Sequence, residues 1–237
     1  MIDNKSFYDK VWKNAQLIDH TKFPVWSLLK TYIEPTSRLL EIGPGVRPRL
    51  PISKTIYFDI SKEAVDRLNY IRSGCAVLGS PERMPFPNDS FDLICAFDVL
   101  EHIEKDQDIL NEISRVLNTV GTFIFSVPLH QKYFSDFDEE CGHFRRYEVD
   151  EIYEKLSKAN LKIVSVSEHG LKPHYNIVNK IGGYLLKHHP VLAVKIGEPF
   201  YPLALRLRKK PKLVSENIKE YLNKLQEVLI ITKKASA

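Results

Sequence analysis

The segment Glu41-Ile42-Gly43-Pro44-Gly45 joins a short apolar run to a glycine turn that an acid precedes. Glycines let the backbone approach a ligand that a side chain would block. A second acid, Asp59, ends the next apolar run, where a carboxylate can accept both hydroxyl hydrogens of a ribose. Together these residues indicate a nucleoside-containing ligand beyond the carboxyl ends of two strands.

A nicotinamide dinucleotide is the obvious alternative ligand for such a turn. Its fingerprint G-x-G-x-x-G needs a third glycine for close packing of the next helix against the strand. Here Pro48 stands at that position, and Val46-Arg47-Pro48-Arg49 is a poor start for a helix that must hold a pyrophosphate. The acid Glu41 also suits a ligand that carries a positive ammonium group better than a dinucleotide.

The elements that must position these residues alternate between strands and helices. Short apolar runs predict strands at 37–42, 55–60, 76–79, 91–97, 121–127, 161–166 and 228–232. Helices are predicted between them, one after the favourable N-cap Ser61 and one over 149–159. Strands that alternate with helices of about 10–15 residues indicate an α/β fold, a doubly wound and mostly parallel sheet of seven strands.

We expect a single domain over residues 1–237. Apolar residues at helix-like spacings predict N-terminal helices within 1–35, with a break near Pro24. The ligand-binding core covers 36–170, and the final strand and tail cover 225–237. Residues 171–224 lie where a plain doubly wound fold needs only a hairpin, so we interpret them as a helical insertion before the last strand.

Four further segments follow this core in a characteristic order. They are Pro85-Phe86-Pro87-Asn88-Asp89-Ser90-Phe91-Asp92, Asp98-Val99-Leu100-Glu101-His102, Arg115-Val116-Leu117 and Ser126-Val127-Pro128. In order and spacing, the sequence closely resembles the class I methyltransferases that depend on S-adenosylmethionine (SAM), of the methyltransferase type 11 kind. The resemblance covers roughly residues 37–170 and the final strand, and it implies a Rossmann-like methyltransferase fold.

The resemblance implies that SAM is the cofactor. In that family the acid at Glu41 faces the methionine part of SAM, Gly43 and Gly45 bring the backbone close, and the acid at Asp59 holds the ribose hydroxyls. Residues after the fourth strand lie along the methionine or the sulfonium. The cofactor-binding residues that we expect are Glu41, Gly43, Pro44, Gly45, Asp59, Ile60, Ser80, Pro81, Phe97, Asp98 and His102.

The sequence departs from the family pattern at two places. Arg47 replaces the third glycine, and Ser80 replaces the acid that usually contacts the adenine amino group. Pro81 follows and has no N–H to offer adenine, so Ser80, Glu82 or Met84 would have to take over. These departures motivate an alternative function, that of a SAM-binding or assembly protein without turnover.

Methyl transfer needs a general base only if the acceptor is a hydroxyl or a protonated amine. A similar H-x-R-R-Y element occurs in many methyltransferases of this class, and here it is His143-Phe144-Arg145-Arg146-Tyr147. We expect His143 as the first catalytic candidate, with His130 and Tyr147 as further candidates. We expect the acceptor to be a small or lipid-linked molecule that is methylated at O, N or C.

Each of these candidates also has a structural interpretation. His143 and Arg145 could fix their loop by binding its acids, and His102 could cap the loop after the fourth strand. Arg146 and Tyr147 could bind an anionic substrate, or they could pair with Asp138 or Glu139 and cap the next helix.

The formal net charge of +4 is unevenly distributed. Residues 171–215 hold nine lysines or arginines and one acid, which gives +8 (9 − 1). An apolar stretch there ends in Arg206-Leu207-Arg208-Lys209-Lys210-Pro211-Lys212, so residues 171–212 could contact an anionic membrane surface or a lipid-linked acceptor. The alternative is a helical lid with solvated charges. Nucleic acid is not expected as a partner, because aromatic-basic patterns are missing.

The cysteines Cys75, Cys95 and Cys141 are widely spaced. Because they form no C-x-x-C pair, we expect neither disulfides nor a bound metal. The N-terminal residues do not resemble a signal peptide, and no long apolar stretch suggests a membrane span. These features favour a cytoplasmic protein, and they leave its oligomeric state open.

Overall fold

The computed structural model describes residues 4–170 and 176–235. Their central feature is a seven-stranded sheet in the order β3-β2-β1-β4-β5-β7-β6. The pairs that β7 forms with β5 and β6 are antiparallel, and the other neighbouring pairs are parallel. The strands are β1 Leu39–Ile42, β2 Thr55–Asp59, β3 Ala76–Leu78, β4 Phe91–Phe97, β5 Leu117–Pro128, β6 Leu161–Glu168 and β7 Glu227–Lys234. The predicted α/β, doubly wound, mostly parallel sheet is confirmed.

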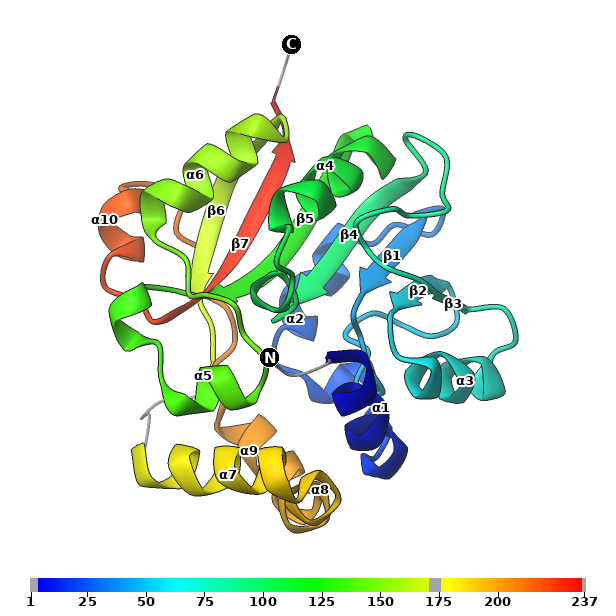
Figure 1. Ribbon diagram of the computed structural model, residues 1–237. Coiled ribbons are helices and arrows are strands. Elements are labelled where there is room, and N and C mark those ends of the chain that lie inside the picture. Colours follow the sequence, from blue (N-terminus) through cyan, green and yellow to red (C-terminus); the bar gives the residue numbers. More distant parts are fainter. Residues whose placement is uncertain (1–3, 171–175, 236–237) are drawn as a thin grey trace.

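Helices cover both faces of this sheet (Figure 1). On one face, α4 (Asp106–Val116) and α6 (Val149–Lys158) bury Ile113 and Ile152 against strand residues such as Ile94. On the other face, Leu39, Leu93 and Ile124 pack against Phe23, Val25 and Leu29. The alternation of side chains along each strand therefore divides the apolar residues between two core layers.

The helix α3 (Lys62–Ile71) packs Val65 and Leu68 against Tyr57 of β2. Its N-cap is Ser61, as the sequence predicts, and the Ser61 hydroxyl accepts the N–H of Ala64. This cap starts α3 directly after the carboxyl end of β2, so the acid that ends β2 lies beside the start of a helix.

The N-terminal segment differs from the helices expected up to residue 35. Only α1 (Asn4–Asn14) is long, and 3₁₀ turns at His20–Lys22 and Lys30–Tyr32 flank the short α2 (Trp26–Leu29). The first helix ends at Asn14, well before the break expected near Pro24, and the chain then bends back. Nη1 of Arg67 binds the Ala15 carbonyl at 2.6 Å, and the Ile18 N–H donates to the Val46 carbonyl.

The insertion has two parts with different places in the fold. Its first helices are α7 (Asn176–His188), α8 (Pro190–Gly197) and α9 (Tyr201–Leu207). They lie with α1 and α5 (Asp136–Glu140) beyond the carboxyl ends of the parallel strands (Figure 1). The chain then returns to the sheet, where Val214 bridges Val166 of β6 and α10 (Ile218–Leu222) buries Leu222 in the core. Only the first part therefore has the position of a lid.

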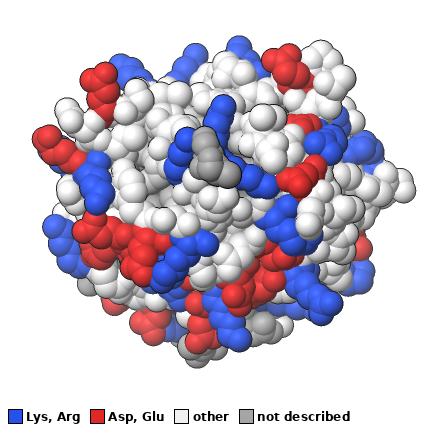
Figure 2. All heavy atoms as spheres, turned by 90° about the horizontal axis from the view of Figure 1, so that it is seen from above, with Lys and Arg blue, Asp and Glu red and all other residues white. Residues whose placement is uncertain are grey.

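The opposite end of the sheet carries small groups of basic and acidic side chains that lie side by side (Figure 2). Two of the ion pairs near this end are Arg38–Asp92 at 2.9 Å and Lys234–Asp89 at 2.9 Å. Exposed pairs of this kind contribute little to stability. Across the residues that the structure describes, no helix is long and apolar enough to cross a bilayer.

Candidate functional site

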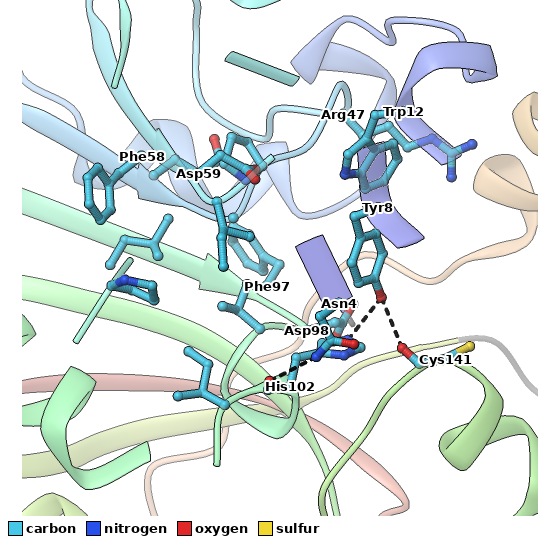
Figure 3. A pocket seen from close by; sticks show the side chains of 18 of the residues that line it. Asn4, Tyr8, Trp12, Arg47, Phe58, Asp59, Phe97, Asp98, His102 and Cys141 are labelled. Carbon is cyan, nitrogen blue, oxygen red and sulfur yellow. Dashed lines mark hydrogen bonds between the residues drawn. The ribbon is translucent and has the colours of Figure 1, made fainter. Parts of the chain in front are cut away.

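A cavity of about 660 Å³ lies at the carboxyl ends of β1, β2 and β4. Helix α1, the loop after β5 and the insertion also line it. It brings together most of the residues expected from the sequence, namely Glu41, Gly43, Pro44, Asp59, Ile60, Ser80, Pro81, Phe97, Asp98, His102 and His143. Gly45 lies behind this lining. Figure 3 shows these side chains around the cavity: Asp59 ends β2, Phe97 and Asp98 lie at the end of β4, and His102 belongs to the 3₁₀ turn that follows.

The glycine turn takes a conformation that side chains disfavour. Gly43 has φ +63° and Gly45 has φ +56°, in the left-handed region. A Cβ atom on Gly45 would overlap the ring of Trp12, and one on Gly43 would lie 2.7 Å from Val99. The glycines therefore allow both the turn and the close packing of α1 over it.

Glu41 lies beneath the turn and holds it in place. Its carboxylate accepts the Arg49 N–H at 2.9 and 3.0 Å and the Leu50 N–H at 2.9 Å. Burial raises the pKa of Glu41 to about 7, against the lowering effect of these hydrogen bonds. Glu41 thus lines the cavity while it orders residues 43–50.

Asp59 is oriented in a similar way at the end of β2. Its two carboxylate oxygens accept the N–H groups of Gly45 at 2.9 Å and Ser61 at 2.8 Å. Burial raises the pKa of Asp59 to about 6. Each oxygen keeps a lone pair, so the carboxylate can also accept hydrogen bonds from vicinal hydroxyls in the cavity.

Beyond Asp59 the cavity is lined by Gly79, Ser80, Pro81 and Glu82. The Ser80 hydroxyl donates to the Glu82 carboxylate, so these two side chains form one polar unit. Met84 is buried outside the lining, and its N–H donates to Glu112. Of the three residues considered for this end of the cavity, Ser80 and Glu82 are the ones that reach it.

Helix α1 supplies a wall of the cavity that the sequence analysis did not identify. Asn4, Tyr8 and Trp12 line the cavity, spaced at four residues along one face of the helix. The Asn4 amide donates to the His102 carbonyl at 3.1 Å. In the sequence, this four-residue spacing is the feature that could have identified the three residues as one face of a helix.

Basic residues after the glycine turn form a second unexpected wall. Arg47 pairs with Glu198 at 2.5 Å and lies 3.6 Å from the ring centre of Tyr201, both from the insertion. Arg49 lies 3.7 Å from the ring centre of Phe23. Arg47, Arg49 and Tyr201 line the cavity, so the insertion closes over the site through contacts with Arg47.

The loop around the H-x-R-R-Y element is organised by Asp138. This buried carboxylate lies 3.0 Å from Nδ1 of His143 and 2.8 Å from Nη2 of Arg146. Burial alone would raise the pKa of Asp138, but the hydrogen bonds from His143, Arg146 and Ser135 outweigh it and hold the pKa well below its usual range. The structural interpretation of Arg146 is correct, since it pairs with Asp138. His143 combines this contact with a place in the cavity lining.

The structure does not bring His130 and Tyr147 to the cavity. His130 is buried between the Glu148 carboxylate, 3.2 Å from Nδ1, and the Leu222 carbonyl, 3.4 Å from Nε2. The Tyr147 hydroxyl donates to Asp106 at 2.8 Å inside the core. Both residues therefore join elements of the fold, and neither is in contact with the cavity.

The turn after β4 meets the His143 loop at a second buried acid. Glu101 is 1 % exposed, and burial raises its pKa well above the usual value. Burial also lowers the pKa of His102 to about 3, so its imidazole is neutral. The rings of His102 and His143 lie edge to face at 4.5 Å, and the Phe144 N–H donates to the Glu101 carbonyl at 2.7 Å.

Comparison with known families gives a match to a family model described as a methyltransferase domain, over residues 40–125. Two proteins of Methanocaldococcus jannaschii, both named as uncharacterised, are similar in sequence. MJ1123 is 28% identical over 166 residues, 65% of this chain and 78% of the relative. MJ0638 is 30% identical over 158 residues, 58% of this chain and 68% of the relative.

Among solved structures, the chain is similar to a protein of Thermotoga maritima, TM1293. That protein is described as a SAM-dependent methyltransferase and a possible histamine N-methyltransferase. The TM-score is 0.58 at 15% identity, and the match covers 91% of each chain. At this identity the likeness shows a shared fold.

Proposed function

The chain belongs to the class I SAM-dependent methyltransferases, and from this premise we propose that it transfers the SAM methyl group to an acceptor held near His143. The observation that supports the proposal is one continuous cavity. Asp59 and the Gly43 turn line one part of it, and His102 and His143 line another. A cavity of about 660 Å³ is within the usual range for a ligand pocket.

The residues present fit the cofactor. SAM carries two positive groups, and Glu41, Asp59 and Asp98 line the cavity with three carboxyl groups. Burial opposes the ionisation of Asp98, but His169 and the Ser126 hydroxyl hold its pKa below the usual value. Asp98 is thus an anion at the end of β4. Asp59, with both oxygens fixed by backbone N–H groups, is the residue that we propose to hold the ribose.

The bound cofactor supplies a methyl group attached to a sulfonium sulfur, and the thioether that remains after transfer is a good leaving group. The protein has to orient the acceptor and keep water away. Asp138 fixes Nδ1 of His143, which leaves Nε2 for the acceptor. Where the acceptor is a hydroxyl or an ammonium group, Nε2 can take its proton.

We propose a small or lipid-linked acceptor, and an exposed apolar surface supports the second kind. Large apolar side chains on α7–α9 are exposed, among them Ile181, Tyr184, Leu192, Ile196, Phe200, Leu203 and Leu207. Leu207 also lines a second cavity of about 500 Å³, together with Arg49, Arg208, Lys209, Lys210 and Lys212. Apolar and basic side chains together suit an acceptor that has a hydrocarbon part and an anionic part.

A protein that binds SAM without turnover is the second candidate. The observation that favours it is the adenine end, where Ser80 and Pro81 stand in the cavity wall and Ser80 is already bonded to Glu82. Such a protein would bind the cofactor and its demethylated product and would transfer no label.

The test is incubation of the protein with methyl-labelled SAM and separate pools of small metabolites, lipids and glycans, alongside calorimetric titration with SAM. Label in an acceptor, lost in His143→Ala and Asp59→Asn, supports the proposed function. Binding of SAM with no label in any pool supports the silent binding protein. Absence of SAM binding contradicts both.

A further inference from the structure

Three side chains with metal-ligating atoms converge at the His143 end of the cavity. One ligand atom from each of Glu101, His102 and His143 lies within 4.8 Å of the others. We propose that these residues form a binding site for a divalent transition-metal ion such as Zn²⁺, Mn²⁺ or Fe²⁺. Such a site departs from the expectation of no bound metal, which considered only the cysteines. His143 is far from Glu101 and His102 along the chain, and the fold brings the three together.

The strongest observation is a carboxylate oxygen that lacks a partner. Oε2 of Glu101 is buried and has no hydrogen-bond donor within the part of the chain that the structure describes. A buried polar atom left unsatisfied destabilises the fold, so native structures rarely keep one without a reason. A cation between Glu101 and the two imidazoles would supply the missing partner.

The second observation is that each histidine is already oriented by its other ring nitrogen. Nδ1 of His143 lies 3.0 Å from the Asp138 carboxylate, which leaves Nε2 to ligate. Nδ1 of His102 lies 3.3 Å from the Gly142 carbonyl, which can only accept, so Nδ1 carries the proton and Nε2 has the lone pair. Metal-bound histidines commonly donate their second N–H to a carboxylate or a backbone carbonyl.

The donor set indicates which cations fit. Two imidazoles and one carboxylate suit Zn²⁺ and Fe²⁺, whereas Mg²⁺ and Ca²⁺ prefer oxygen ligands alone. Ligand atoms about 2.1 Å from a common ion lie roughly 3–4 Å apart, so binding requires a contraction of about 1 Å. Side-chain rotation can provide this, together with release of the Tyr8 hydroxyl, now 3.3 Å from Nε2 of His102.

A structural explanation accounts for part of the cluster only. Contacts with Gly142 and Asp138 could simply join the turn after β4 to the His143 loop. Those contacts use Nδ1 of each histidine, and they leave Oε2 of Glu101 without a hydrogen-bond partner. The metal site explains all three side chains at once.

The site also narrows the class of acceptor, and this step rests on the proposed function. His102 and His143 line the cavity, so the open coordination positions of the ion would face it. A hydroxyl or phenol oxygen bound there would become more acidic. In the metal-bound protein His143 is then a ligand, and the acceptor is an oxygen compound.

Binding is tested on full-length protein treated with a chelator, in the absence of SAM and acceptor. We expect one Zn²⁺ or Mn²⁺ per chain by calorimetry, and a visible absorption band on titration with Co²⁺. Glu101→Gln and His143→Ala should each weaken Zn²⁺ binding by more than about 10-fold. Loss of a residue that only hydrogen-bonds to a metal ligand already weakens metal affinity about 10–100-fold. His189→Ala, which changes an exposed histidine, is the matched control.

The wild-type Co²⁺ spectrum keeps the test valid if a variant fails to fold. No binding of Zn²⁺, Mn²⁺ or Co²⁺ to the wild type tighter than about 1 mM overturns the site. Binding that survives both substitutions also overturns it. Methyl transfer without metal binding would support the proposed function alone, and metal binding without methyl transfer would support the site alone.

Discussion

The hydroxyl of Tyr8 lies 3.3 Å from Nε2 of His102, although the two residues are 94 positions apart in the sequence. The same hydroxyl lies 3.4 Å from the Cys141 carbonyl, so its one proton is shared between two acceptors, and Figure 3 shows Tyr8 directed toward both of them. Helix α1 is thus joined to both loops that surround the His143 end.

Removal of the Tyr8 hydroxyl should loosen α1 and leave the fold intact. Because one hydrogen bond contributes about 0.5–1.5 kcal/mol, Tyr8→Phe should lower the free energy of unfolding by about 1 kcal/mol. Amide exchange in residues 4–14 should accelerate, and SAM should bind several-fold more weakly. Tyr70→Phe, at a side chain that is 93% exposed, is the control. Equal exchange rates in α1 of both variants would contradict this role.

Gly45 should be far less tolerant of a side chain than another glycine with the same backbone conformation. Both Gly45 (φ +56°) and Gly74 (φ +72°) are left-handed, so alanine at either costs about 1–2 kcal/mol. A Cβ atom meets nothing within 4 Å at Gly74 but overlaps the Trp12 ring at Gly45. Gly45→Ala should therefore unfold at a lower temperature than Gly74→Ala and lose SAM binding, as measured by thermal denaturation and calorimetry. Similar values for both would contradict the packing argument.

The sheet could be predicted from the sequence because buried parallel strands appear as short apolar runs. Phe91–Phe97 was predicted with its correct bounds. The secondary structure of the N-terminal segment was predicted less well, because the spacing of apolar residues indicates which side chains are buried and does not by itself require a helix. Phe23, Val25 and Leu29 are buried against the sheet although no long helix carries them. β7 is longer than predicted, because it pairs in the antiparallel sense with both β5 and β6 from Glu227 to Lys234. β5 also begins earlier than predicted, at Leu117, which pairs with Phe91 of β4.

The residues of the candidate site could be predicted where they lie at the carboxyl end of a strand. Glu41 and Asp59 were expected to line one cavity because parallel strands place their carboxyl ends side by side, and Asp98 was expected there from the family resemblance. Tyr8 was not, since only tertiary packing brings α1 to the cavity. His130 was a candidate by its residue type, which does not indicate where the side chain points. Its backbone has φ +63°, a conformation that the sequence does not predict for a histidine.

The affinity for SAM should depend on pH through Asp59. Its pKa is about 6, and a ribose favours the ionised carboxylate as an acceptor. Affinity should therefore rise as pH increases through 6 and reach a plateau only above pH 7, where Glu41 is also ionised, with at most about 10-fold change per pH unit. Glu41, with a pKa of about 7, titrates nearby. Calorimetry from pH 5 to pH 8 should show that Asp59→Asn binds more weakly and loses the step near 6. An identical pH profile in the variant would exclude this role.

The basic segment after α9 should govern any attachment to anionic membranes. Lys209, Lys210 and Lys212 line the second cavity together with Leu207, an exposed apolar residue of α9. Because each basic residue near an anionic surface contributes about 1 kcal/mol, replacing these three by Gln should weaken vesicle binding about 100-fold. The control replaces three exposed lysines elsewhere, Lys54, Lys105 and Lys132. Failure of the wild type to sediment with anionic vesicles at low salt would rule out membrane contact through this segment.

Asp106 should be a second acid, besides Asp138, that stabilises the H-x-R-R-Y loop. It accepts the Tyr147 hydroxyl and pairs with Arg145 and Lys155, each at 2.8 Å. Removing one partner of such a buried group costs about 3 kcal/mol, so Asp106→Asn should lower the unfolding free energy by this amount, while the exposed Asp108→Asn changes little. Burial opposes ionisation, but Lys155, Tyr147 and Arg145 hold the pKa of Asp106 below its usual 3.8. The stabilisation is therefore fully present above pH 3.8 and is lost as pH falls through the lower folded-state value. Denaturant unfolding of both variants from pH 3 to pH 7 measures this, and an Asp106→Asn deficit that persists unchanged to the lowest pH would exclude the ionised carboxylate as its cause.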